Sequence, residues 1–242
     1  LEPLTAHLVL APDAAIDLQM HTTCSDGVWT PEELVDYLVR ERFDLVAVTD
    51  HDRPDSVASM QQLAAQKNLP VLAVVEMTTS WRGQMVDVLC YGFDPEKNEL
   101  NDLAQDVLRR QQENTREVYE NLHRKGYTFS EQQESVKEGG GEPQQPRELM
   151  AILEKPSAQQ PQELIALLEK HGYRTGETSL GDLITEAGFF FATNGIAAVV
   201  DAAHHSGAVC LIAHPGRGGE FPKFDPPLLD QLHSEVPIDG LE

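Results

Sequence analysis

The sequence of 242 residues predicts an α/β fold built on a parallel sheet or barrel. Three short apolar runs end abruptly at polar or charged residues: Ile16–Met20, Asp44–Thr49 and Val71–Glu76. Segments in which apolar residues recur at helical spacing separate these runs. Successive runs start about thirty residues apart, which is the length of a βα unit, and right-handed crossovers of that kind produce parallel strands.

The segments between these runs carry helix start and stop signals. Thr30-Pro31-Glu32-Glu33 combines a threonine cap, a proline in the first turn and a glutamate that closes a capping box. The apolar residues between positions 34 and 39 then fall on one helical face. A second helix is predicted over Asp55 to Lys67, because Asn68 and Pro70 follow it as stop signals.

After the third run the pattern changes to a hairpin and a long helix. Thr78 to Phe93 is predicted to form the hairpin, with Arg82-Gly83 near its turn. Glu96 to Lys125 is highly charged and is predicted to form one helix, which Gly126 ends as a C-terminal cap.

The middle of the chain is predicted to be an inserted helical cap. A near repeat occurs there, since Gln144 to Lys155 (QQPRELMAILEK) resembles Gln159 to Lys170 (QQPQELIALLEK). Each copy has proline at a helix start and leucines at helical spacing, whereas two copies are too few for a solenoid. We therefore expect residues 1–129 and 194–242 to form the main fold and residues 130–193 to form the insert.

The α/β pattern resumes near the C-terminus. A helix over Ile196 to His205 is followed by a turn at Ser206-Gly207 and a strand over Ala208 to Ala213. A short helix over Leu228 to His233 and the start of a strand at Ile238 complete the pattern. Because the sequence stops inside a predicted strand, we expect the C-terminal part of the fold to be missing from it.

Composition narrows the class of protein. The formal charge of −22 disfavours a surface for polymeric nucleic acid, which needs many cations along one face. The three cysteines form neither a CxxC pair nor a disulfide framework, which favours a reducing compartment. No membrane span and no leader peptide are recognisable, so the prediction is a cytoplasmic protein without a membrane partner.

A metal site is predicted where the strands end. His21, His51, Glu76 and His214 each directly follow or close an apolar run, and Asp26, Asp50 and Asp87 lie near such ends. One such histidine alone is more often an ordinary surface or core residue, but four coincident strand ends favour a shared site. Imidazoles mixed with carboxylates suit Zn²⁺, Mn²⁺ or Fe²⁺, and a hydrolytic centre of two or three such ions is expected.

These motifs resemble the PHP (polymerase and histidinol phosphatase) phosphoesterases, and specifically their nucleotide phosphatase and phosphodiesterase branch. The similarity rests on Asp17-Leu18-Gln19-Met20-His21, Ser25-Asp26-Gly27, Thr49-Asp50-His51-Asp52, Glu76 and Ala213-His214-Pro215. The resemblance implies a distorted, TIM-like (β/α)7 barrel with an inserted helical subdomain. It also implies up to three metals at the C-terminal ends of the strands.

The resemblance assigns ligand positions to His21, Asp26, His51, Glu76 and His214. The chain departs from the family pattern in several places. Gln19 stands where the family has a histidine, and it is kept as an additional candidate ligand although its amide oxygen is a weaker donor. Asp87 stands where a hairpin histidine is usual, and it can also ligate a metal. A later Asp-x-His motif is absent, and Arg147-Glu148-Leu149 keeps only the arginine of an Arg-x-His pair.

The predicted activity is hydrolysis of a small phosphate ester, such as a nucleotide or sugar phosphate, by metal-activated hydroxide. The catalytic candidates are His51, Glu76 and His214, with Glu76 expected to bridge two metals. The candidates for substrate contact are Asp26, Arg110, Arg116, Arg147 and Arg217. The predicted cap favours an enclosed small substrate over polymeric nucleic acid.

Two other readings remain open. The chain could be a degenerate or truncated member of the family that binds phosphate ligands without turnover, and metal content would distinguish that case. It could also be an amidohydrolase-like enzyme acting on a C–N bond. The closeness of His21 to Ser25-Asp26-Gly27 fits the phosphoesterase pattern better.

Overall fold

A computed structural model describes residues 5, 8–126, 180–218 and 221–242, and it confirms the α/β class. The chain divides into two compact units, Leu1–Val107 with Thr193–Glu242, and Leu108–Ala192. The near repeat and most of the predicted insert lie outside the described residues, so the predicted boundaries of the insert remain a prediction. No helix in the described part of the chain has the length and apolar character needed to cross a membrane.

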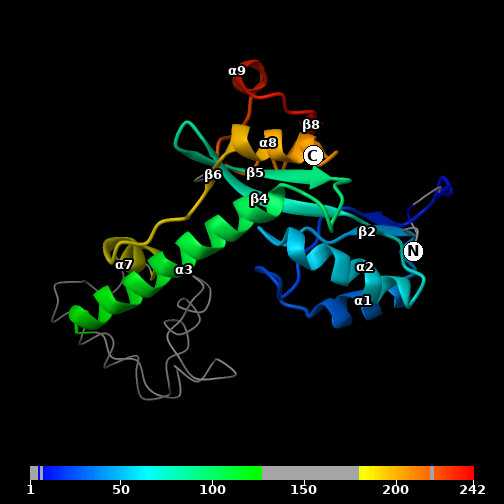
Figure 1. Cartoon of the computed structure of the whole chain (residues 1–242), viewed down its shortest axis with the longest axis horizontal. Helices are drawn as coiled ribbons and strands as arrows, with labels where there is room; N and C mark the ends of the chain where they lie inside the picture. Colours follow the sequence, from blue (N-terminus) through cyan, green and yellow to red (C-terminus); the bar gives the residue numbers. More distant parts are fainter. Residues whose placement is uncertain (1–4, 6–7, 127–179, 219–220) are drawn as a thin grey trace. The chain divides into compact units, whose positions relative to one another are not determined.

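The first unit contains a three-stranded parallel sheet in the order β1-β2-β3. Its middle strand, β2, is labelled in Figure 1. Its strands are β1 (Ile16–Asp17), β2 (Leu45–Ala47) and β3 (Val71–Leu72). Two helices, α1 (Pro31–Arg40) and α2 (Val57–Ala65, after the 3-10 turn η1, Pro54–Ser56), connect them. Buried residues of both helices share one apolar cluster with Val46 and Val71, which confirms the predicted βα units.

The predicted capping box starts α1. The Thr30 hydroxyl accepts a hydrogen bond from the Glu33 N–H at 3.2 Å, and the Glu33 carboxylate accepts one from the Thr30 N–H at 2.9 Å. Two N–H groups that the helix itself leaves unpaired are thereby satisfied, which fixes where the loop after β1 becomes a helix.

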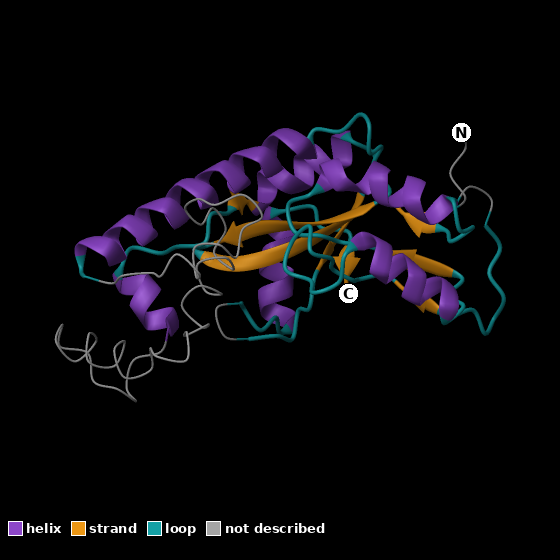
Figure 2. Ribbon diagram, turned by 90° about the horizontal axis from the view of Figure 1, so that it is seen from below, coloured by secondary structure: helices purple, strands orange, loops and turns teal. Residues whose placement is uncertain are grey.

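A second sheet of five strands has the order β6-β4-β5-β7-β8. The strands are β4 (Val74–Trp81), β5 (Gln84–Tyr91), β6 (Asn194–Gly195), β7 (Val209–Ile212) and β8 (Gly240–Leu241). Arg82 and Gly83 have φ of 52° and 80°, so they form the predicted two-residue hairpin turn. Two helices separate the later strands along the chain: α8 (Ile196–His205) lies between β6 and β7, and α9 (Pro226–Glu235) between β7 and β8. Figure 2 shows the strands in orange with the purple helices around them.

The single strand predicted over Val71–Glu76 is divided at Ala73. β3 pairs with β2 in the first sheet, whereas β4 pairs with β5 in the second, and the Ala73 carbonyl accepts the Gly92 N–H at 2.7 Å. A parallel bridge between His51 and Glu76 joins the two sheets. The described strands therefore form two sheets and no closed barrel, so the (β/α)7 arrangement is not confirmed.

The helix α3 (Leu100–Arg124) begins in the first unit and continues into the second. Gly126, with φ of 94°, follows its end as predicted. Within the second unit, side chains of α3 hold the backbone that follows α7 (Leu180–Glu186): Gln111 pairs with the Ala192 N–H at 2.8 Å and Asn114 with the Gly188 carbonyl at 2.9 Å.

Candidate metal centre

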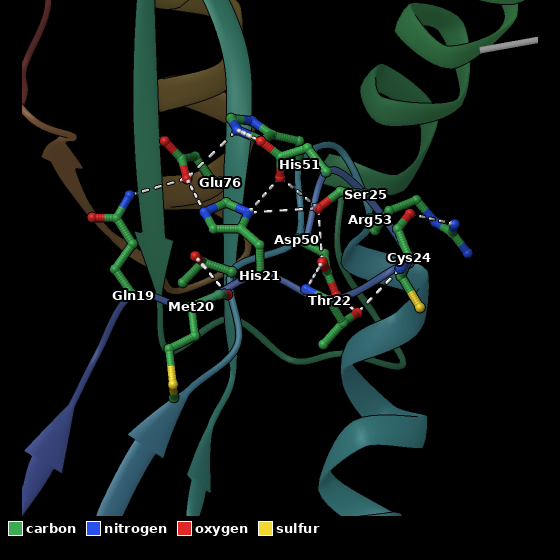
Figure 3. Close-up of polar contacts among 12 residues, drawn as sticks. Gln19, Met20, His21, Thr22, Cys24, Ser25, Asp50, His51, Arg53 and Glu76 are labelled. Carbon is green, nitrogen blue, oxygen red and sulfur yellow. Dashed lines mark hydrogen bonds and ion pairs between the residues drawn. The ribbon is translucent and has the colours of Figure 1, made fainter. Parts of the chain in front are cut away.

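Five predicted side chains come together around the buried carboxylate of a sixth, Glu76. Glu76, on β4, is fully buried, and its two oxygens face different groups of histidines and carboxylates. Figure 3 shows one of these groups, with His21 and His51 beside Glu76. The residues gathered there follow β1 and β2, lie on β4 and β5, or follow β7: His21, Asp26, His51, Glu76, Asp87 and His214. Their roles as ligands stay a prediction, but their convergence is a property of the fold.

The first side of this centre contains His21, Asp26 and His51 next to the Glu76 Oε2 atom. His21 Nε2 lies 3.1 Å from Glu76 Oε2, and His21 Nδ1 lies 3.1 Å from Asp26 Oδ1. His51 Nε2 lies 3.9 Å from Glu76 Oε2 and 4.0 Å from Asp26 Oδ2. The two imidazole rings stack with centroids 4.9 Å apart.

The second side contains Asp87 and His214 next to the Glu76 Oε1 atom. His214 Nε2 lies 3.0 Å from Glu76 Oε1 and 3.4 Å from Asp87 Oδ2. His214 has a φ of 34°, in the left-handed region that a non-glycine residue rarely adopts. Its N–H donates to Glu242 Oε2 at 2.7 Å, and the Ala213 N–H donates to the Asp87 carbonyl at 3.0 Å. The first bond ties the turn to the residue after β8, and the second ties it to β5.

The charges in the centre are strongly coupled. Burial disfavours the His21 imidazolium, but hydrogen bonds to Asp26 and Glu76 overcome it and raise the pKa of His21 from 6.5 to about 10. Burial likewise opposes ionisation of Glu76, yet hydrogen bonds from His21 and His214 hold the pKa of Glu76 well below its usual range. Burial raises the pKa of Asp87 to about 6, aided by the charge of Glu76.

The donor set fits divalent transition metals. Two groups, each with ligand atoms within 4.8 Å of one another, share Glu76: His21 with His51, and Asp87 with His214. Among the described residues, the buried Asp87 Oδ1 and His214 Nδ1 atoms have no hydrogen-bond partner. A buried polar atom without a partner is costly, and a bound ion or its water could supply one. Imidazole nitrogens with carboxylates suit Zn²⁺, Mn²⁺ or Fe²⁺.

Gln19 enters the centre as a hydrogen-bond donor. Its Nε2 atom lies 3.1 Å from Glu76 Oε2, the oxygen that His21 also faces. Because an ionised carboxylate only accepts hydrogen bonds, the amide atom nearest to it must be the nitrogen. In this arrangement the Gln19 amide supports Glu76, and ligation through its oxygen would require the side chain to turn.

Two buried aspartates flank His51, and neither was among the predicted metal ligands or catalytic residues. Asp50 is 4% exposed and accepts hydrogen bonds from the loop after β1. Asp52 is equally buried, has a φ of 52° and accepts the Thr78 N–H at 3.0 Å, while burial raises the pKa of Asp52 to about 6. The signal that could have found them is the Asp-His-Asp spacing, since a turn at the strand end can aim all three side chains inward.

The four arginines predicted to contact the substrate lie in different parts of the chain. Arg217 follows His214 by three residues, its guanidinium lies 4.5 Å from the centre of the Phe221 ring, and its charge reaches Asp87. Arg110 and Arg116 lie on the part of α3 that belongs to the second unit. Arg147 lies outside the described residues. Arg217 is therefore the arginine that the described part of the first unit places beside the centre.

Comparisons with known proteins agree with this picture. No protein-family model matches the chain. It is 38% identical over 82 residues to a 3′,5′-nucleoside bisphosphate phosphatase of Chromobacterium violaceum, covering 34% of this chain and 29% of that protein. It is 25% identical over 203 residues to the 5′-3′ exoribonuclease Rnm of Salmonella typhimurium, covering 83% of this chain and 65% of that protein. The chain thus spans less than two thirds of either relative.

Two solved structures share the fold. One is a proposed metal-dependent phosphoesterase from Bifidobacterium adolescentis, with a TM-score of 0.69, 21% identity, and coverage of 96% of this chain and 77% of that one. The other is an amidohydrolase from Chromobacterium violaceum with bound sulfate and no metal, with a TM-score of 0.66, 22% identity, and coverage of 94% and 76%. Together, the relatives and these folds confirm the predicted resemblance to the PHP phosphoesterases, and the named relatives are hydrolases.

Proposed function

We propose that the chain carries the catalytic centre of a metal-dependent phosphoesterase, with a small phosphate ester such as a nucleotide or sugar phosphate as substrate. The observation that supports this most directly is the position of Glu76. It is fully buried, and one oxygen faces the His21 and His51 side while the other faces the Asp87 and His214 side. A carboxylate in that position can bridge two divalent ions, whereas an imidazole cannot.

In this proposal His21, His51 and Asp26 complete the first ion position, and Asp87 and His214 complete the second. Two such ions, when bound, activate a water molecule and neutralise the oxygens of a phosphoryl group. Asp26, Glu76 and Asp87 carry less negative charge than two divalent ions carry positive charge. The loaded centre would therefore attract a phosphate group even though the whole chain is acidic.

Arg217 is the residue proposed to hold the substrate phosphate. Its guanidinium stacks on Phe221, whose ring lies edge-on to His214 with centroids 5.3 Å apart, and this contact limits the rotamers of the arginine. A guanidinium binds phosphate oxygens with two parallel hydrogen bonds, so a pre-ordered one favours binding. The sulfate bound in the structurally similar amidohydrolase supports anion binding by this fold.

The test is turnover of a panel of phosphate esters in the presence of Mn²⁺. The panel contains a nucleoside 3′,5′-bisphosphate, a nucleoside monophosphate, a sugar phosphate and a short 5′-phosphorylated RNA. Turnover of the small esters that is lost in Glu76→Gln would support the proposal. Metal analysis of the same samples separates an inactive metal-bearing chain from a binder without metal, and absence of both metal and turnover would refute the proposal.

A second candidate is a 5′-3′ exoribonuclease activity. It is favoured by the Rnm relative, whose match covers 83% of this chain. The predicted exclusion of polymeric nucleic acid is therefore not supported. Release of mononucleotides from the 5′-phosphorylated RNA, with little turnover of the small esters, would identify this candidate.

A further inference from the structure

Asp50 lies next to the centre but contacts none of the six gathered side chains through a described hydrogen bond. Its side chain is buried, and its oxygens accept three hydrogen bonds of 2.7 Å: from the Thr22 N–H, the Thr22 hydroxyl and the Ser25 hydroxyl (Figure 3). A buried carboxylate needs such donors to offset its lost hydration. All three donors belong to the loop between β1 and α1.

This loop is wound around Thr22. The Thr22 side chain is fully buried, and its hydroxyl oxygen also accepts the Cys24 N–H at 3.1 Å. The Thr22 carbonyl accepts the N–H groups of Ser25 at 3.1 Å and Gly27 at 2.9 Å. The Asp50 carboxylate therefore ties a compact turn to the end of β2.

The residues tied down in this way are the direct neighbours of three groups in the centre. His21 precedes Thr22, Asp26 follows Ser25, and His51 follows Asp50. His21 and Asp26 must lie on the same side of the turn to keep their 3.1 Å contact. Asp87 and His214 are held by other bonds, to the turn after β7 and to Glu242.

We propose that Asp50 is the positioning residue of the His21, Asp26 and His51 side of the centre, and that it has no comparable effect on the Asp87 and His214 side. Its consequence for ion binding rests on the proposed function. Loss of a partner that orients metal ligands typically weakens metal affinity about 10- to 100-fold. The effect should be confined to one of the two ion positions.

The test variant is Asp50→Asn, which keeps the size of the side chain but turns one acceptor into an N–H₂ donor facing the donors of Thr22 or Ser25. The matched control is Asp44→Asn at the other end of β2. Asp44 accepts the Ala15 N–H at 2.9 Å, so it ties the start of β2 to the residue before β1. This contact lies at the end of β2 that points away from the centre. Thr22→Val and Ser25→Ala remove single donors and replace the main variant if it does not fold.

The first readout is the ¹H–¹⁵N spectrum of the histidine side chains in the metal-free protein. Asp50→Asn should shift the His21 ring signals and leave those of His214 in place, while Asp44→Asn should shift neither. Movement of both rings, or of neither, would overturn the proposal. This readout decides the matter even if the chain binds no metal.

The second readout is Mn²⁺ calorimetry, with His21→Ala and His214→Ala identifying the two ion positions. Asp50→Asn should weaken the ion lost in His21→Ala by about 10- to 100-fold and change the other by less than about twofold. Equal weakening of both ions, or normal binding of both, contradicts the proposal. Absence of binding by the unaltered chain would instead count against the proposed function.

Discussion

Gly27 is expected to be the position least tolerant of a small substitution in the loop after β1. A Cβ atom placed on it would lie 2.3 Å from the His21 carbonyl oxygen and 2.6 Å from the Thr22 nitrogen. Both neighbours are backbone atoms, so no side chain can rotate to make room. The variant Gly27→Ala must therefore displace the backbone on at least one side of this contact.

The size of that displacement follows from the contact distance. The 2.3 Å contact is about 1.1 Å shorter than the 3.4 Å at which ordinary contacts begin. Because the His21 carbonyl makes the contact and Asp26 directly precedes Gly27, the backbone displacement moves the side chains of both His21 and Asp26. A displacement of about 1 Å in a catalytic group can cost about 100-fold in rate, and an overpacked site typically costs about 1–3 kcal/mol of stability.

The assay compares Gly27→Ala with Gly216→Ala, which lies on the loop after His214. A Cβ atom on Gly216 would meet no atom within 4 Å, and its φ is not in the left-handed region. Gly27→Ala should lower kcat/KM about 100-fold and weaken Mn²⁺ binding, whereas Gly216→Ala should match the unaltered chain. A Gly27→Ala protein with unchanged kcat/KM and metal affinity would refute the reasoning.

Four further predictions concern the centre itself. The pKa of His21 is raised from 6.5 to about 10, so protonation of His21 stabilises the fold fully below pH 6.5 and this effect is lost as the pH rises towards 10. The melting temperature in EDTA should therefore fall between these pH values in the unaltered chain, and should fall less in His21→Gln. An equal fall of the melting temperature in both proteins would contradict this prediction. The pKa of Asp87 is raised from 3.8 to about 6, so the ionised carboxylate destabilises the metal-free fold at neutral pH. Asp87→Asn should melt at a higher temperature than the unaltered chain in EDTA yet bind fewer Mn²⁺ ions, and a lower melting temperature would contradict this prediction. Arg217→Ala should raise KM for a phosphate ester and leave the melting temperature unchanged. Arg217→Lys should give an intermediate KM, because an ammonium cannot form the two parallel hydrogen bonds of a guanidinium, and an unaltered KM in Arg217→Ala would exclude the proposed phosphate contact. Gln19→His should tighten Mn²⁺ binding in calorimetry because an imidazole replaces an amide that donates to Glu76, and unchanged binding would show that this position does not limit affinity.

Helix starts, turns and single helices were predictable where all the residues that specify them lie close together in the sequence. The capping box at Thr30 and Glu33, the hairpin turn at Arg82 and Gly83, and the helix Ile196–His205 all appear where the sequence placed them. Each depends on hydrogen bonds or steric preferences among residues a few positions apart, so the rest of the fold is not needed to specify it.

The division of Val71–Glu76 at Ala73 was not predictable in the same way. Five consecutive apolar residues are compatible with either sheet, and only the partners of each half, β2 for β3 and β5 for β4, decide where the strand changes sheets. The direction of the Gln19 amide is a similar case. The amide can donate or accept, and the buried carboxylate of Glu76 decides that it donates.

By itself, the sequence predicted which side chains gather at the centre, because histidines and carboxylates at successive strand ends are recognisable from their order along the chain. Only the tertiary structure decided how these side chains are divided between the two sides of Glu76. Glu76 is placed between two groups, Asp50 is directed to the loop that carries His21, and Asp87 is left with an unpaired oxygen. These outcomes depend on contacts between residues 25 to 138 positions apart, such as Ser25 with Asp50 and Glu76 with His214, and on burial that strengthens each charge interaction.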